Sequence, residues 1–409
     1  MLAQEPITDV FIFSHGWQGD IPAAQKQYSR WIKAMATNTA DQDKMKQLRP
    51  GFSPLLIGLH WPSLPWGNET ILASSEEDAV ESLADHYADQ ISDNDTSKAI
   101  SKAALKTIFS EALGDMEPDE LSDAALEAYE TLNNETSLGS GGTAAAPDDD
   151  REPFDPESIY EESEVETEEF GEIDYGILDG GGFILNRIFS PLKALSYWKM
   201  KARARTFGEK AGFDLLNTLQ HTASEQVQFH LVGHSFGCIV MSATLAGPKA
   251  QGMLHRPVNS LTLIQGAVSM WAYCADIPKD RGYAGYFYPI IRDSKVAGPI
   301  ITTFSKHDTA VGLLYPLASG LSMSTIDFAG LPKYGAIGAF GIQGDAIPVN
   351  SLEMLPCSQD YSFEAGQIYN LESSRYICKK PKEAGIAGAH GEFDEPEVAH
   401  AVWSAAMAS

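Results

Sequence analysis

A serine between two glycines is the feature of the sequence that most directly suggests chemistry. Ser235 is the centre of Gly233-His234-Ser235-Phe236-Gly237, between an apolar run at 228–232 and an apolar stretch at 238–245. The run is typical of a buried strand, and the stretch of a helix that begins there. A sharp strand-to-helix turn strains the backbone of its central residue and points the first helical amides toward it. The pattern predicts that Ser235 is a nucleophile, whereas a plain turn of small residues gives no reason for a serine there.

A carboxylate follows a later apolar run. Asp308 lies in the turn Ser305-Lys306-His307-Asp308-Thr309, directly after the run at 299–304, where it could accept the second ring proton of a histidine. An aspartate at the end of a strand also serves as a plain turn former. The rival acid is Asp276, which lies further beyond its strand and close to Pro278. Position therefore favours Asp308.

The serine motif in its strand–helix setting resembles the α/β-hydrolase superfamily, within the serine esterase and lipase branch. The resemblance covers the strands and helices outside a long inserted stretch, about two thirds of the chain. In such proteins the order along the chain is Ser, then Asp or Glu after a later strand, then His after the last strand. Carried over, this order implies Ser235 as nucleophile, Asp308 as acid and His390 as base.

His390 lies in Gly388-Ala389-His390-Gly391-Glu392-Phe393, between the last predicted strand and the final helix. Its small neighbours would let the loop bring the ring over Ser235. The alternative base is His400, on the closing helix, but its register with Val398 and Trp403 indicates that it packs in the core. The resemblance therefore favours His390.

The exit of the first predicted strand, Phe13-Ser14-His15-Gly16-Trp17, is the fourth element. In the esterases and lipases that the chain resembles, a His-Gly pair ends this strand, and the amide of the next residue lines an oxyanion hole. Carried over, the resemblance implies that the amides of Trp17 and Phe236 bind the oxyanion. For the side chain of His15 we favour a structural role, bracing the loop by hydrogen bonds.

Three side chains near these elements are candidates for contact with a substrate: His15, His234 and Trp61. Trp61 belongs to His60-Trp61-Pro62, which follows a strand on the side where parallel sheets bind ligands.

The resemblance implies hydrolysis of a carboxylic ester, from a small molecule or a lipid, through an acyl-enzyme. Such a reaction needs no metal or cofactor, and the cysteines and histidines lack metal-site spacing. Three alternatives stay open: an amidase or peptidase with the same three residues, an acyltransferase in which an alcohol replaces water, and a non-catalytic binding module on the same fold. Competent residues at all three positions argue against the binding module.

Short apolar runs alternate with helical stretches, which predicts a mostly parallel central sheet flanked by helices. The resemblance implies that this sheet belongs to an α/β-hydrolase fold. Six runs are predicted strands: 9–13, 54–60, 228–232, 260–265, 299–304 and 367–371. The clearest predicted helices are 21–37, 196–221, 238–245 and 395–407.

Residues 65–186 interrupt this alternation, so we expect a core of residues 1–64 and 187–409 with an inserted cap. The first half of the insertion, 69–132, reads as amphipathic helices that could cover the mouth of the site. The segment 139–174 begins with small residues and continues with fourteen carboxylates against the single Arg151. Such a run predicts a solvated, mobile strap, with weak attraction to the basic stretch 193–205.

The 409-residue chain is strongly acidic, with 29 Lys and Arg against 56 Asp and Glu and a net charge of −27. This charge disfavours nucleic acid and anionic lipid as partners. No run reaches the length of a membrane span, and the N-terminus lacks the pattern of a secretory signal. We therefore expect a soluble, cytoplasmic protein, unless a signal has been trimmed; oligomeric state stays open. Of the four cysteines, Cys357 and Cys378 flank a predicted strand and could pair.

Overall fold

The structure of the protein is a computed structural model. It describes residues 7–17, 21–63, 76–92, 94–115, 118–136, 138, 145–161, 163, 187–278, 280–315, 319, 331–344, 347–378 and 385–408.

The centre of the fold is a seven-stranded sheet in which every neighbouring pair of strands is parallel. In chain order the strands are β1 (Asp9–Ser14), β2 (Pro54–Leu59), β3 (Gln228–His234), β4 (Ser260–Ile264), β5 (Ile300–Phe304), β6 (Val349–Glu353) and β7 (Ile368–Glu372). Their order across the sheet is β2-β1-β3-β4-β5-β7-β6. The prediction of a parallel α/β sheet is confirmed, and the six predicted strands agree with six of the seven observed within two residues at each end.

The sheet has one strand more than the six that were predicted, and the additional strand is β6. It lies at the sheet edge beside β7, and from Asn350 to Glu353 its residues are exposed. An edge strand that faces solvent has no need of an apolar run, so the sequence Val-Asn-Ser-Leu-Glu carries no strong strand signal.

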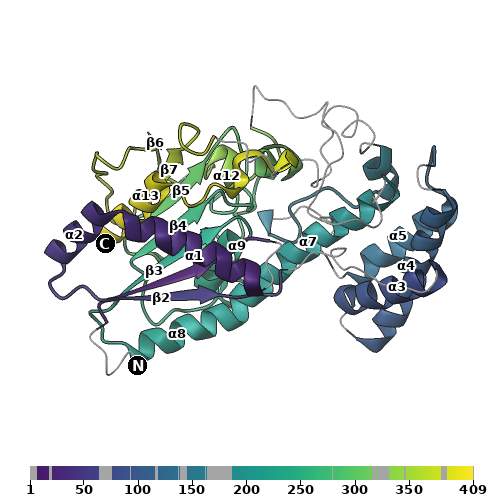
Figure 1. Ribbon diagram of the computed structural model, residues 1–409, viewed down its shortest axis with the longest axis horizontal. Coiled ribbons are helices and arrows are strands. Elements are labelled where there is room, and N and C mark those ends of the chain that lie inside the picture. Colours follow the sequence, from purple (N-terminus) through teal and green to yellow (C-terminus); the bar gives the residue numbers. More distant parts are fainter. Residues whose placement is uncertain are drawn as a thin grey trace.

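Helices surround the sheet (Figure 1). Those outside the insertion are α1 (Ile21–Thr37), α2 (Thr39–Leu48), α7 (Ser190–Phe207), α8 (Phe213–Thr222), α9 (Gly237–Ala246), α10 (Tyr288–Arg292), α12 (Ile337–Phe340) and α13 (Pro396–Met407). Short helical turns add η2 (Arg187–Phe189), η3 (Gly208–Gly212), η4 (Pro248–Ala250), η5 (Ala310–Leu314) and η7 (Gly385–Gly391). The predicted helix 196–221 is α7, the π-helical turn η3 and α8 in succession, and it begins earlier than predicted.

Alternation along the strands sends side chains into two cores. In β1, Val10 and Ile12 face a core built with α7, α8 and α9, whereas Phe11 and Phe13 face a core built with α1, α2 and α13. Because residues of a strand alternate between its faces, an apolar run such as this one marks a strand buried on both faces. Burial on both faces explains the apolar run of β1, whereas β2 at the sheet edge is exposed or half-buried along most of its length.

The insertion contributes three helices, α3 (Glu76–Ile91), α4 (Asp95–Gly114) and α5 (Asp123–Glu135). They pack on one another, α5 also contacts α7, and the group lies beside the amino-terminal part of α7 (Figure 1). These helices agree with the predicted helical half of the insertion. Their role as a cap stays a prediction.

The start of the acidic segment is packed against the core, where the sequence led us to expect a solvated strap. Asp150 and Arg151 are 2% and 3% exposed, and Asp148 forms an ion pair of 2.6 Å with Arg205. Tyr315 donates a hydrogen bond of 2.6 Å to Asp150. Partners from distant parts of the chain therefore make burial of these charged side chains possible. The ion pair of Asp148 with Arg205 agrees with the predicted attraction between the acidic segment and the basic stretch 193–205. Residues 162 and 164–174, also predicted to be mobile, lie outside the described residues.

All four cysteines are free, including Cys357 and Cys378. Within the described ranges, the helices are too short or too polar to cross a bilayer.

Candidate active site

Ser235 sits at a strained turn between β3 and α9. Its φ is 56°, in the left-handed region that a non-glycine residue rarely adopts. A Cβ on Gly233 would lie 2.5 Å from the carbonyl oxygen of Gly237, and a Cβ on Gly237 would lie 2.2 Å from the carbonyl oxygen of Ser14. Glycine is therefore required at both positions because backbone passes directly against them.

Three residues that are far apart in the sequence form one hydrogen-bonded chain. His390 Nε2 lies 2.8 Å from Ser235 Oγ, and His390 Nδ1 lies 2.8 Å and 3.0 Å from the two carboxylate oxygens of Asp308. A carboxylate can only accept, so Nδ1 carries the proton and the lone pair of Nε2 faces the serine. This tautomer is the one that can take a proton from Ser235.

The carboxylate of Asp308 is fixed from several sides. It is 1% exposed, and its Oδ1 accepts a hydrogen bond of 3.3 Å from the backbone amide of Val311. Its Oδ2 accepts one of 3.0 Å from Nε2 of Gln265, the residue that follows β4. Two neutral N–H donors thus stabilise the negative charge of the Asp308 carboxylate, whose side chain has no exposed surface.

The loop that carries His390 is tied to two neighbours. The amide of Ala389 donates to the carbonyl of His307 over 2.9 Å, which joins this loop to the loop that carries Asp308. The ring of His234 lies against the ring of His390, with centroids 5.0 Å apart. Burial holds the pKa of His234 well below its usual range, so this ring stays neutral.

The loop after β1 contacts the serine turn directly. A Cβ on Gly16 would lie 2.9 Å from the Cβ of Ser235, so only glycine lets the two turns approach this closely. In the described part of the chain, no hydrogen bond occupies the backbone N–H of Trp17 or of Phe236. Both amides that the resemblance implied for an oxyanion hole are free to bind an oxygen.

His15 and Trp61 brace that loop. Nδ1–H of His15 donates to the carbonyl of Gly16 over 2.8 Å, and Nε1–H of Trp61 donates to the carbonyl of His15 over 3.1 Å. Burial lowers the pKa of His15 to about 4, so the ring is neutral at physiological pH. Because the Gly16 carbonyl and the Trp17 N–H belong to one planar trans peptide, they point in opposite directions, and His15 thereby sets the direction of the Trp17 N–H.

Neither of these two side chains offers surface to a ligand in this structure: His15 is 1% exposed, and Trp61 is fully buried. His234, the third candidate for contact with a substrate, is also buried. The structural role that we favoured for His15 agrees with its contacts, and the same kind of role fits Trp61.

An aromatic cluster joins the two turns. The rings of Trp17 and Phe236 stack with centroids 5.5 Å apart, and Tyr197 of α7 packs on both, at 5.6 Å and 5.1 Å. The side chains of the two residues with free amides are thus held together by a third ring from α7. Burial raises the pKa of Tyr197 well above its usual range, so its hydroxyl keeps its proton.

The rival residues lie elsewhere. Asp276 accepts a hydrogen bond from the amide of Gly282 and pairs with Arg281 at 3.5 Å, as a turn former does. His400 is buried between Asp41 and the carbonyl of Gln359, each 2.8 Å from a ring nitrogen. Neither forms a hydrogen bond with Ser235, Asp308 or His390.

Sequence reasoning missed Gln265 and Tyr197. Gln265 contacts Asp308 from 43 residues away, and Tyr197 reaches Phe236 from an earlier helix. Neither stands in a motif, and a glutamine after a strand or a tyrosine in a helix carries no local signal of function.

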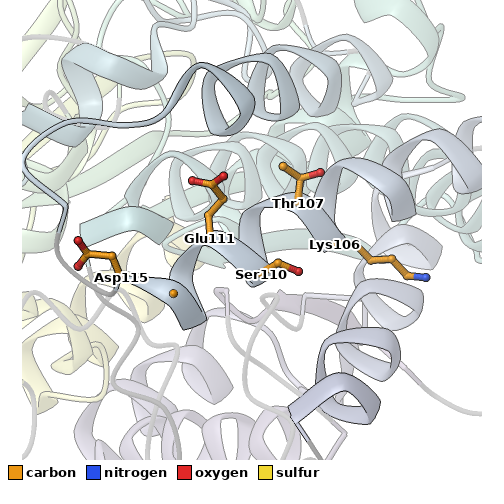
Figure 2. A pocket seen from close by; sticks show the side chains of 6 residues that line it. Lys106, Thr107, Ser110, Glu111 and Asp115 are labelled. Atoms are coloured by element: carbon orange, nitrogen blue, oxygen red, sulfur yellow. The ribbon is translucent and has the colours of Figure 1, made fainter.

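A wide groove of about 670 Å³ lies along one side of α4. It is lined by Lys106, Thr107, Ser110, Glu111, Gly114 and Asp115 (Figure 2). It shares no residue with the site around Ser235, and no histidine lines it beside Ser110, so it offers no activated nucleophile. Among the described residues, no cluster of three or more His, Cys, Asp or Glu side chains is arranged to hold a metal ion.

Comparisons with family models, with curated proteins and with solved structures found no match to this chain.

Proposed function

We propose that this chain is a serine hydrolase of the α/β-hydrolase type that cleaves carboxylic esters through an acyl-enzyme. The observation that carries the proposal is the hydrogen-bonded chain from Ser235 Oγ through His390 to Asp308, with contacts of 2.8 Å on both sides of the imidazole. A nucleophile, a base within hydrogen-bond reach and a group that orients the base are the parts that acyl transfer needs.

In the first step Ser235 Oγ attacks the carbonyl carbon of the ester while His390 Nε2 takes the hydroxyl proton. The resulting imidazolium is stabilised by Asp308, whose carboxylate accepts the Nδ1 proton without taking it up. The tetrahedral intermediate then collapses, the bond to the leaving alcohol breaks, and His390 returns its proton to the alcohol oxygen. The acyl group remains on Ser235.

The negative charge that develops on the carbonyl oxygen is stabilised by hydrogen bonds from the backbone N–H groups of Trp17 and Phe236. Both N–H groups are free of other hydrogen bonds in the described residues, and the Phe236 amide opens the helix that follows the serine. Backbone donors that are fixed before the reaction need no reorganisation, and one such donor is worth about 100- to 1000-fold in rate.

In the second step His390 removes a proton from water, and the water oxygen attacks the acyl carbon. The bond from that carbon to Ser235 Oγ then breaks, His390 returns its proton to Oγ, and the acid is released. Esters are the proposed class because the His15-Gly16 pair at the exit of β1 is the feature that resembles esterases and lipases. The amidase, acyltransferase and binding-module alternatives remain as outcomes of the test.

The test combines active-site labelling with turnover. We expect a fluorophosphonate probe to label Ser235 alone, as mapped by peptide mass spectrometry, and p-nitrophenyl acetate and butyrate to be hydrolysed. Ser235→Ala should lose both signals. Ser242→Ala is the matched control, because Ser242 is a buried serine of α9 that donates to the carbonyl of Cys238.

Activity that survives Ser235→Ala in a folded protein would falsify the proposal. Labelling of Ser235 without ester turnover, but with turnover of p-nitroanilides, would redirect it to an amidase. Ester consumption only with an added alcohol would indicate an acyltransferase.

A further inference from the structure

We infer that Gln265 is a positioning residue. It fixes the loop that carries the proposed acid, Asp308, relative to the loop that carries the proposed base, His390. The inference rests on the proposed function, in which Asp308 and His390 act together. Its basis is one side chain that donates hydrogen bonds to both loops.

Gln265 follows β4, between the serine strand β3 and the acid strand β5. Its backbone is in the left-handed region, with φ of 45°, and its amide donates to Oγ1 of Thr303 over 3.1 Å. This unusual backbone directs a fully buried side chain toward the ends of the neighbouring strands.

The side-chain amide makes two contacts of 3.0 Å from the same nitrogen. Nε2 donates one hydrogen to Oδ2 of Asp308 and the other to the backbone carbonyl of Ala389, the residue before His390. A primary amide has two N–H groups that diverge in one plane, so one glutamine can link two acceptors on separate loops. Glutamate and methionine have no such donors, and asparagine is one carbon shorter.

The other end of the same amide argues against a purely structural role. Oε1 of Gln265 is buried and has no hydrogen-bond partner among the described residues. A buried acceptor without a partner destabilises the folded state, so this amide is far from the most stabilising choice for the core. The two hydrogen bonds that Nε2 donates, to Asp308 and to the Ala389 carbonyl, are the better explanation for a glutamine at this position.

The consequence for the reaction has two parts. First, the hydrogen bond to Ala389 fixes the backbone beside His390, and a base displaced by even 1 Å loses on the order of 100-fold in rate. Second, the hydrogen bond to Oδ2 draws charge from the carboxylate that faces the imidazole. Without this donor Asp308 carries more of its charge toward His390, which favours the protonated base.

The test compares Gln265→Met with Gln220→Met. Gln220 is the matched control, a buried glutamine of α8 whose side chain donates to the carbonyl of Arg256 over 2.9 Å, away from the serine. For Gln265→Met we expect kcat on p-nitrophenyl acetate to fall on the order of 10- to 100-fold, with KM little changed. In a plot of kcat/KM against pH, the fall in activity on the acidic side should begin at a higher pH, because loss of the donor favours the protonated form of His390. Gln220→Met should leave kcat and the pH profile as in the wild type.

A second variant keeps the inference falsifiable if Gln265→Met does not fold. Gln265→Glu has nearly the same shape but no N–H donor and a charge beside Asp308, so we expect a larger fall in kcat and a larger shift of the acidic limb. A folded variant of Gln265 with wild-type kcat and an unshifted profile would overturn the inference.

The proposed function is tested separately by Ser235→Ala. If Ser235→Ala is inactive while Gln265 variants behave as the wild type, the hydrolase stands and only the positioning role fails. If Ser235→Ala is active, the proposed function fails, and the positioning role is overturned with it because there is no base to position.

Discussion

The ring of His234 donates a hydrogen bond from Nε2 to the backbone carbonyl of His390 over 2.9 Å, and its Nδ1 accepts one of 3.1 Å from Gln27. The residue before the proposed nucleophile, Ser235, thus holds the loop that carries the proposed base. His390 is therefore placed from two directions, since the Ala389 carbonyl also binds Gln265.

His234→Ala should lower kcat by about 10-fold while KM changes little, because the loop of His390 loses one of its supports. The measurement is steady-state hydrolysis of p-nitrophenyl acetate. His221→Ala, which removes an exposed histidine of α8, is the control and should be neutral. Equal kinetics for the two variants would show that the contact with the His390 carbonyl does not matter for turnover.

Asp308→Asn and His390→Ala should each reduce kcat by several orders of magnitude, about 10⁴-fold for the acid by analogy with other Ser-His-Asp sites. Combining either with Ser235→Ala should cost little more, because residues that act as a unit are strongly non-additive. Asp276→Asn is the matched change at the rival acid and should leave turnover intact. If Asp276→Asn proved the damaging variant, the assignment of the acid would be wrong.

Tyr197→Phe should raise the free energy of unfolding by about 1 kcal/mol and keep activity. The Tyr197 hydroxyl is buried without a partner among the described residues, while its ring packs on Trp17 and Phe236. Tyr273→Phe is the opposite case and should destabilise the fold by a similar amount, because its hydroxyl bonds to Ser242. Urea unfolding monitored by circular dichroism measures both. A loss of activity in folded Tyr197→Phe would instead assign the hydroxyl to the reaction.

Stability should depend on pH with two opposing contributions from histidines. Burial lowers the pKa of His15 to about 4 in the folded chain, against 6.5 when unfolded. The unfolded state therefore binds a proton first as pH falls below 6.5, and this site alone costs about 2 kcal/mol of stability at pH 5. Burial also opposes the charge on His400, but its hydrogen bonds to Asp41 and to the Gln359 carbonyl raise its pKa above 6.5. Its stabilisation is complete below pH 6.5 and is lost as pH rises through the higher folded pKa.

Melting temperatures between pH 5 and 8 test these signs. His15→Gln should flatten the loss of stability toward pH 5, whereas His400→Gln should make that loss steeper. His221→Gln, at an exposed position, should leave the slope unchanged. Parallel slopes for all three variants would contradict the assignment.

The sequence alone determined the features that depend on local sterics and on chain order. The turn at Ser235 follows from glycines at 233 and 237, because any Cβ there would collide with nearby backbone. Asp308 was predicted from its place after a later strand, and His390 from the order that the resemblance implies. His390 does contact both Ser235 and Asp308, because the carboxyl ends of parallel strands meet at one edge of the sheet. Six of the seven strands were visible because each coincides with a short, mostly apolar run. In β1, β3, β4, β5 and β7 the run is buried on both faces, whereas β2 at the sheet edge is exposed or half-buried along most of its length.

Only the tertiary structure decided which polar side chains support that edge. Gln265 meets the Ala389 carbonyl across 124 residues of sequence, and His234 meets the His390 carbonyl across 156. Asp150, in a run of carboxylates that reads as solvated, is buried because Tyr315 donates to it from 165 residues away. A hydrogen-bond donor stabilises a buried acceptor only where the folded chain places the two about 3 Å apart, and nothing in the local sequence of either residue encodes that distance.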